Sequence, residues 1–174
     1  MNRLIILISV CTIFLSQTFT FCPAQAETLS VEQKTQLEKW QASLDDISVT
    51  ENTWPKQMCE KDFPIKMDAS LVAPFMAAGN EANYYCREVR EKLSTICRNA
   101  QSYLKEGNKK DNKKLINTLI NKITCKFSKG AENDALFDLN KGELIVSIGA
   151  KASNISEKLL SFLYKKQGFN PGNQ

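Results

Sequence analysis

Four of the six cysteines, at positions 59, 86, 97 and 125, constrain what this 174-residue chain can fold into more than any other feature. The other two, Cys11 and Cys22, lie in the N-terminal segment that we expect to be removed. An even number of cysteines in an exported domain is typical of disulfides. Zinc is the rival interpretation, but the chain has no His and no Cys-x-x-Cys pair, so the usual zinc ligand spacings are absent. We therefore expect two disulfides, no metal site and no cofactor.

The first 26 residues have the pattern of a cleaved signal peptide. Arg3 supplies a positive start, residues 4–15 form an apolar run, and Ala24-Gln25-Ala26 gives the small-x-small cleavage pattern. Cleavage there leaves 27–174, which we interpret as a single disulfide-stapled globular domain. No other stretch approaches the ~18 apolar residues that span a bilayer. We expect a periplasmic or secreted bacterial protein with a Sec-type signal peptide and no membrane span.

Apolar residues repeat at helical spacing in four segments. The first begins at a capping box formed by Ser30 and Gln33. Between the first two segments, residues 48–79 lose the period and contain three prolines, so we expect a long irregular loop there. The predicted helices span about 31–46, 80–105, 111–121 and 154–166.

A change of period predicts strands near the C-terminus. In 122–128, apolar and polar side chains alternate as in a half-buried strand. Strands are also expected at 135–139 and 143–149, joined by the hairpin turn Asn140-Lys141-Gly142-Glu143. The predicted class is α+β, with the N-terminal helices packed on a three-stranded antiparallel sheet and a C-terminal helix.

Helix geometry removes one of the three ways to pair the four cysteines. Cys86 and Cys97 lie 11 residues apart on one predicted helix, which is about 16 Å of axial rise. A disulfide needs Cα atoms within about 7 Å, so these two do not pair with each other. If the chain enters the helix from its N-terminal side and folds back after it, Cys59 pairs with Cys86 and Cys97 with Cys125.

The lack of His removes Ser-His-Asp and Cys-His catalysis, and no catalytic residues are assigned. Carboxylate chemistry remains, because residues 27–82 hold ten acidic residues against five lysines. A small carboxylate-dependent hydrolase is therefore an alternative function, although nothing in the sequence brings two carboxyl groups together.

A lysine-rich segment follows the long helix: residues 105–129 hold eight lysines and two acidic residues. Lys109, Lys110, Lys113 and Lys114 form a candidate basic patch, which favours anionic lipid or polysaccharide as a partner. No aromatic residue is interleaved among them, so nucleic acid is disfavoured. The alternative interpretation is a solvated helix start.

Large apolar residues in the expected loop suggest a docking surface. Trp54, Met58 and Phe63 lie around Cys59 and are candidate anchors for a protein partner. The alternative is that they cover the helices as part of the core. We expect a non-catalytic envelope protein that binds another macromolecule, as an inhibitor, an immunity-type protein or an accessory factor.

Overall fold

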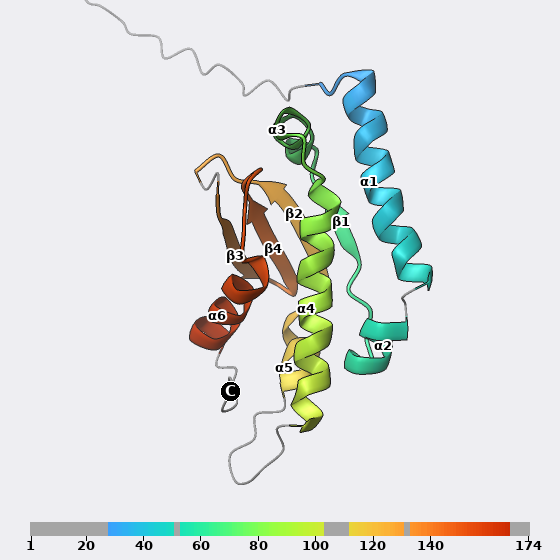
Figure 1. Cartoon of the computed structure of the whole chain (residues 1–174). Helices are drawn as coiled ribbons and strands as arrows, with labels where there is room; N and C mark the ends of the chain where they lie inside the picture. The colour runs from blue at the N-terminus through green and yellow to red at the C-terminus, as the bar shows by residue number, and fades with distance from the viewer. Residues whose placement is uncertain (1–27, 51–52, 103–111, 131–132, 168–174) are drawn as a thin grey trace, which may run out of the picture.

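The computed structural model describes residues 28–50, 53–102, 112–130 and 133–167, and it mixes helices with one sheet, in broad agreement with the α+β expectation (Figure 1). The helices are α1 (Val31–Thr50), α2 (Thr53–Cys59), α3 (Val72–Ala78), α4 (Ala82–Ser102), α5 (Asn112–Leu119) and α6 (Ile155–Gln167), with a 3-10 turn η1 (Ala69–Leu71). Four of them overlap the predicted helices. The predicted signal peptide lies outside the described residues.

The capping box at the start of α1 is confirmed. The Ser30 N–H donates to the Gln33 side chain at 2.9 Å, and the Gln33 N–H donates to the Ser30 hydroxyl at 3.2 Å. Two backbone donors at the helix N-terminus are thereby satisfied reciprocally. None of the described helices is both long and apolar enough to cross a bilayer.

The sheet has four strands, in the order β1-β2-β4-β3. They are β1 (Ile65–Met67), β2 (Lys122–Phe127), β3 (Ala135–Asn140) and β4 (Glu143–Ile148). β1, β2 and β4 are parallel, and β3 alone runs antiparallel, beside β4. The predicted three-stranded antiparallel sheet is therefore wrong in strand count and in direction.

The error has two physical causes. β1 has three residues, which is too few to show a period of two, and it lies inside 48–79, where we expected a loop. That segment instead contains α2, β1, η1 and α3. In addition, β3 follows β2 in the sequence but lies at the sheet edge, separated from β2 by one strand position. β4 then occupies the position between β2 and β3 and pairs with β2 in parallel.

The predicted hairpin between β3 and β4 is confirmed. Asn140 pairs with Glu143, and Lys141 and Gly142 turn the chain with φ values of 48° and 84°. A Cβ at position 142 would lie too close to the side-chain nitrogen of Asn121, which would have to move, and the positive φ itself favours glycine there.

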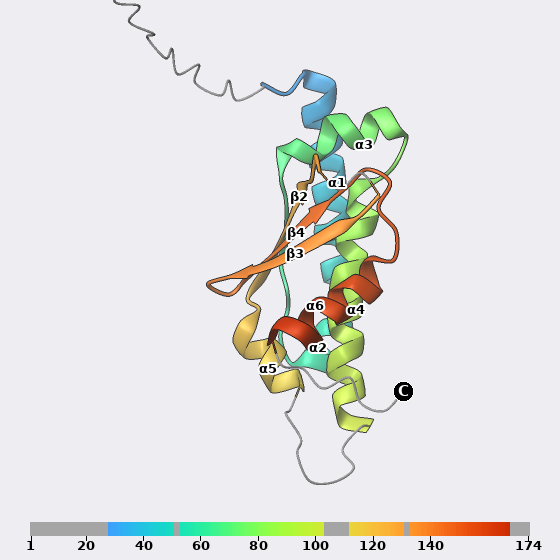
Figure 2. The ribbon, with the colours of Figure 1, turned by 90° about the vertical axis from the view of Figure 1, so that its left-hand side faces the viewer.

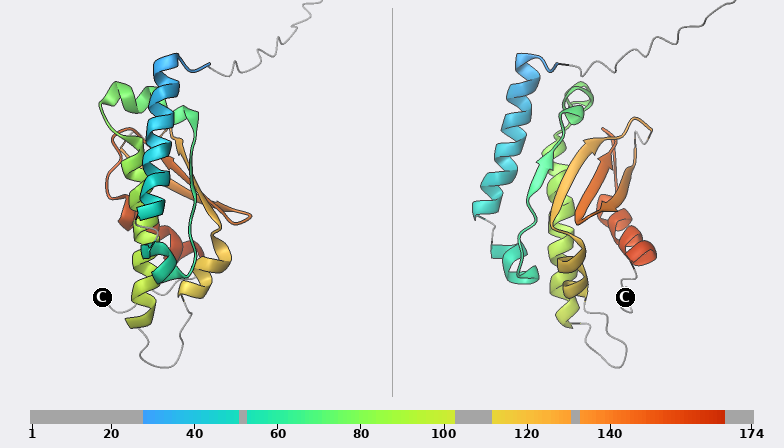
Figure 3. Two further views of the ribbon diagram at one scale, coloured as in Figure 1. Left: turned by 90° about the vertical axis from the view of Figure 1, so that its right-hand side faces the viewer. Right: turned by 180° about the vertical axis from the view of Figure 1, so that it is seen from behind.

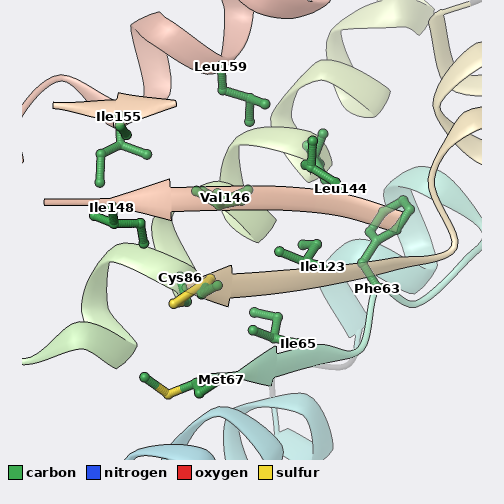
Figure 4. Close-up of a cluster of buried hydrophobic side chains, with 14 of the residues drawn as sticks. Phe63, Ile65, Met67, Cys86, Ile123, Leu144, Val146, Ile148, Ile155 and Leu159 are labelled. Atoms are coloured by element: carbon green, nitrogen blue, oxygen red, sulfur yellow. A yellow bond between two sulfur atoms is a disulfide. The ribbon is translucent and has the colours of Figure 1, made fainter. Parts of the chain in front are cut away.

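The hydrophobic core lies on one side of the sheet. Buried side chains from β1, β2 and β4 point towards α4 and α6 (Figure 4). On β4 these are Leu144, Val146 and Ile148, and α6 contributes Ile155 and Leu159. The alternate side chains of the strands face the other way, where no described helix covers them; the sheet lies in front of α4 in the right-hand view of Figure 3.

Side chains satisfy backbone groups at both edges of the sheet. At the β1 edge, the Gln41 side chain of α1 donates to the Ile65 carbonyl (2.9 Å) and accepts from the Met67 N–H (3.0 Å). On β3, the Ala135 and Leu139 N–H groups donate to the side chains of their neighbours, Asp134 and Asp138. Such capping makes an edge strand a poorer template for another chain.

Both disulfides join α4 to other elements, but not in the predicted pairs. Cys59 is bonded to Cys97, with Cα atoms 5.1 Å apart, and Cys86 is bonded to Cys125, at 6.2 Å. The predicted pairing of Cys59 with Cys86 and Cys97 with Cys125 is wrong. The exclusion of a bond between Cys86 and Cys97 is confirmed.

The chain path explains the pairing. α2 lies beside the C-terminal part of α4, and β1 then runs along the core to α3 at the other end (Figures 1 and 2). Cys59, at the end of α2, therefore lies beside the C-terminal part of α4, although it precedes α4 in the sequence. β2 starts near α5 and runs parallel to β1, so it carries Cys125 to the beginning of α4.

We expect Cys59→Ala/Cys97→Ala to lower the free energy of unfolding by about 4 kcal/mol. The bond closes a loop with a sequence separation of 38, and a loop of that size restricts the unfolded chain to about this extent. Denaturant unfolding of the oxidised proteins measures the difference. Non-reducing peptide mapping of the wild type is the control, and a Cys59–Cys86 peptide would contradict the pairing.

Candidate binding surface

The structure buries one of the three predicted anchors completely and a second one in part. The Phe63 side chain is fully buried, and Met58 is partly buried against the core. Phe63 as an exposed anchor is therefore wrong, and the core interpretation holds for it. Trp54 belongs to α2, but its side chain lies outside what the structure describes.

Part of the predicted basic patch makes contacts within the protein. Lys113 is largely buried, with its side chain 15% exposed, and its Nζ lies 2.6 Å from Oε1 of Glu60. Lys114 also has an interaction partner within the protein. Lys109 and Lys110 fall outside the described residues. Lys113 thus attaches α5 to the end of α2 and is not a free cation.

More hydrogen bonds hold the same junction together. Nζ of Lys61 donates to the Asn117 carbonyl (2.8 Å) and to the Asn121 side chain (2.6 Å). The Asn117 amide donates to the Cys59 carbonyl at 2.5 Å. The lysine charge at the last turn of α5 is favourable, because helix C-termini carry unpaired carbonyl groups.

Three of the ten acidic residues in 27–82, from which a carboxylate-dependent hydrolase would draw its groups, make local contacts in the structure. Asp62 accepts from the Phe63 N–H at 2.8 Å, Glu60 pairs with Lys113, and Asp45 accepts from Gln41 at 3.1 Å. Across the described residues, no group of three or more His, Cys, Asp or Glu side chains is placed to hold a metal ion.

A second surface is the side of the sheet turned away from the core, which we call the open face. Alternation along the four strands places ten side chains on it. They are Lys66 on β1; Lys122, Thr124 and Lys126 on β2; Glu143, Ile145 and Ser147 on β4; and Leu136, Asp138 and Asn140 on β3.

Charge is divided unevenly across the open face. The β1–β2 half carries Lys66, Lys122 and Lys126, all exposed, whereas Glu143 and Asp138 lie on β4 and β3. Nζ of Lys122 lies 3.1 Å from the Glu143 carboxylate. A hydrogen bond from Thr124 and the nearby Lys122 lower the pKa of Glu143, so this carboxylate stays ionised at neutral pH.

The rim of the open face next to β1 carries Asp68. The hydrogen bond from the Ser70 hydroxyl is the largest influence on the pKa of Asp68 and lowers it, and burial opposes this effect. The Ser70 backbone N–H and the charges of Lys66 and Lys126 also lower the pKa, so the net shift is downward. Asp68 accepts from the Ser70 N–H at 2.9 Å and begins η1. This carboxylate therefore orders the chain after β1.

Apolar groups accompany the charges. Leu136 is 53% exposed, which makes it one of three large exposed hydrophobic residues in the described part of the chain, and Ile145 is half-buried near the middle of the open face. A surface that combines exposed apolar side chains with charged ones has the make-up of a protein interface.

A shallow groove of about 530 Å³ lies between α1 and β1. Leu37, Ala42 and Met67 supply apolar lining, and Gln41 and Lys66 border it. Because Gln41 occupies the β1 edge, the groove offers no free strand edge to a partner.

One sequence pattern pointed to the open face without identifying it as a binding surface. The alternation in 122–128 predicted a strand with one polar side, and Lys126 was part of it. Lys66 carried no such signal, because β1 is too short to show alternation. No family model, curated protein or solved structure matches the chain.

We expect Phe63→Ala to destabilise the fold by about 3–5 kcal/mol, since it removes a fully buried aromatic side chain. Leu136→Ala is the matched control, and it should change stability by less than about 0.5 kcal/mol because Leu136 is exposed. Denaturant unfolding measures both. Equal effects of the two substitutions would contradict the assignment of Phe63 to the core.

We expect Asp68→Asn to weaken the pH dependence of stability in acid. A carboxyl whose pKa is lowered by folding stabilises the protein above its unfolded pKa of about 3.9, and this contribution is lost as the pH falls through the folded pKa. The variant should therefore be less stable than the wild type at neutral pH, and the two should converge below about pH 4. Thermal melts from neutral pH to about pH 2 measure this, and a constant difference would contradict it.

Proposed function

We propose that this chain is an exported, non-catalytic protein that binds another protein through the open face of its sheet. The observation that carries the proposal is the uncovered sheet face, on which exposed lysines lie beside Leu136 and Ile145. Within the described residues, helices pack on the opposite side, and α1 also lies along the β1 edge.

The chemistry of the open face favours a protein partner. Ile145 and Leu136 give apolar area that is desolvated on contact, which supplies affinity. The lysines on β1 and β2 attract acidic groups and orient the partner, because Asp138 and Glu143 repel the same groups on the other half. An inhibitor, an immunity-type protein or an envelope accessory factor would act by such docking.

Two observations support export. The N-terminal 26 residues have the pattern of a signal peptide. Two cysteine pairs lie at disulfide distance, which fits an oxidising compartment outside the cytoplasm. The periplasm or the extracellular medium is the proposed location.

Site-specific photocrosslinking tests the docking surface. Leu136→p-benzoylphenylalanine places a reactive group on the open face, and Val31→p-benzoylphenylalanine places it on α1, where Val31 is 82% exposed. In an envelope extract of the producing organism, we expect a protein adduct from position 136 and none from position 31.

Charge-reversal variants test whether the adduct forms through the open face. Lys66→Glu/Lys126→Glu should abolish the adduct, and Lys34→Glu/Lys39→Glu on exposed positions of α1 should preserve it. An adduct that survives the first pair, or no protein adduct at position 136, contradicts the proposal. Recovery of an anionic polysaccharide or lipid alone, lost above ~0.15 M salt, would assign the lysines to electrostatic binding instead.

A further inference from the structure

The strand register arranges the open face in rows that cross the sheet. The central row runs Lys66, Thr124, Ile145, Asp138, from β1 through β2 and β4 to β3. Across the sheet, this row begins with a cation and ends with a carboxylate. Its two inner members are a small polar residue and a branched apolar residue, both half-buried.

We propose that the open face binds a second copy of this chain, related to the first by a twofold axis parallel to the strands and between β2 and β4. This rotation lays β1 opposite β3 and β2 opposite β4 of the second copy, and it preserves height along the strands. Lys66 then lies opposite Asp138 of the second copy, and Thr124 lies opposite Ile145 of the second copy. By symmetry each contact occurs twice.

The next row contains Lys122 and Glu143, which occupy one height on β2 and β4 and already form an ion pair within one copy at 3.1 Å. The rotation lays this pair opposite the same pair of the second copy with the charges exchanged, so Lys122 of each copy also lies opposite Glu143 of the other. Sheets that pack face to face lie about 10 Å apart with strand directions within about 30°, which keeps these rows in reach of each other.

Charge favours this axis over the other arrangement that keeps the strands of the two copies aligned. A twofold axis perpendicular to the strands would lay β1 on β1 and β2 on β2. Lys66 would then meet Lys66 of the second copy, and Lys122 would meet Lys126 of the second copy. Like charges opposed across a sheet interface are repulsive.

The size of the open face sets the strength of the dimer. Three strands of six residues and the three-residue β1, at about 4.8 Å per strand and about 3.3 Å per residue, give a footprint of roughly 330 Å² per copy. A stable interface buries about 800 Å² per partner, so the dimer is weak and depends on concentration. The inference rests on the proposed function, because it identifies the partner of the same surface.

Charge exchange between Lys66 and Asp138 tests the inference. Sedimentation equilibrium of the oxidised mature protein at low salt should show a monomer–dimer equilibrium. Lys66→Glu and Asp138→Lys should each raise the dimer dissociation constant about tenfold or more, because each variant places two like-charge pairs in the interface. Both positions are exposed, so thermal melts should stay near the wild type.

Mixing the two variants gives the decisive result. In the mixed dimer, the introduced carboxylate at position 66 of one copy faces the introduced ammonium group at position 138 of the other, while the native Lys66 and Asp138 face each other at the second contact. Equimolar Lys66→Glu and Asp138→Lys should therefore dimerise nearly as well as the wild type, as should the double variant. Lys39→Glu, with the same charge change on α1, should leave the equilibrium unchanged.

Three results would overturn the inference: a wild-type protein that is monomeric at all concentrations, a dimer that neither variant weakens, or a mixture that fails to restore dimerisation. Its failure is distinguishable from failure of the proposed function. If the protein is monomeric and position 136 gives an adduct with the mass of a different protein, the inferred dimer is wrong. The proposal that the open face binds a protein then still holds.

Discussion

Helix α4 carries both disulfides, and the course of the remaining chain depends on their positions along it. Cys97 holds the end of α2 at the C-terminal part of the helix, and Cys86 holds β2 at the N-terminal part. The two attachment points are about 16 Å apart on a rigid rod. The segment from α2 to α4 must therefore travel the length of the helix, and it does so as β1, η1 and α3, which adds a strand to the sheet.

Lysines of this chain have two separate roles that composition alone does not distinguish. Lys61 and Lys113 close the junction between α2 and α5, where they bind carbonyl, amide and carboxylate oxygens. Lys66, Lys122 and Lys126 project from the sheet, where Asp68 and Glu143 remain ionised beside them. The first set stabilises the fold, and the second gives the open face its polarity.

Local signals in the sequence predicted local structure well. The capping box at Ser30, the long amphipathic helix and the hairpin at Gly142 are all decided by neighbouring residues, and each is found. The start of α6 shows where local signals stop being sufficient. The backbone N–H and the hydroxyl of Ser156, in the first turn of α6, donate to Glu88 of α4, which is 68 positions away in the chain. Parallel strand order, the cysteine pairs and the burial of Phe63 likewise depend on long-range packing that periodicity does not encode. The open face was predictable only as the polar side of one strand, because its other members lie on strands whose neighbours are set by that packing.

The disulfides interleave along the sequence, since one joins 59 to 97 and the other joins 86 to 125. Every peptide bond between Cys59 and Cys125 therefore lies inside at least one covalent ring. A protease that cuts the oxidised chain once anywhere in this interval releases no fragment, because the two pieces remain joined through sulfur. Under the pairing of 59 with 86 and 97 with 125, a single cut between positions 86 and 97 would have divided the protein in two. In a compartment rich in proteases, the interleaved arrangement keeps a nicked molecule in one piece.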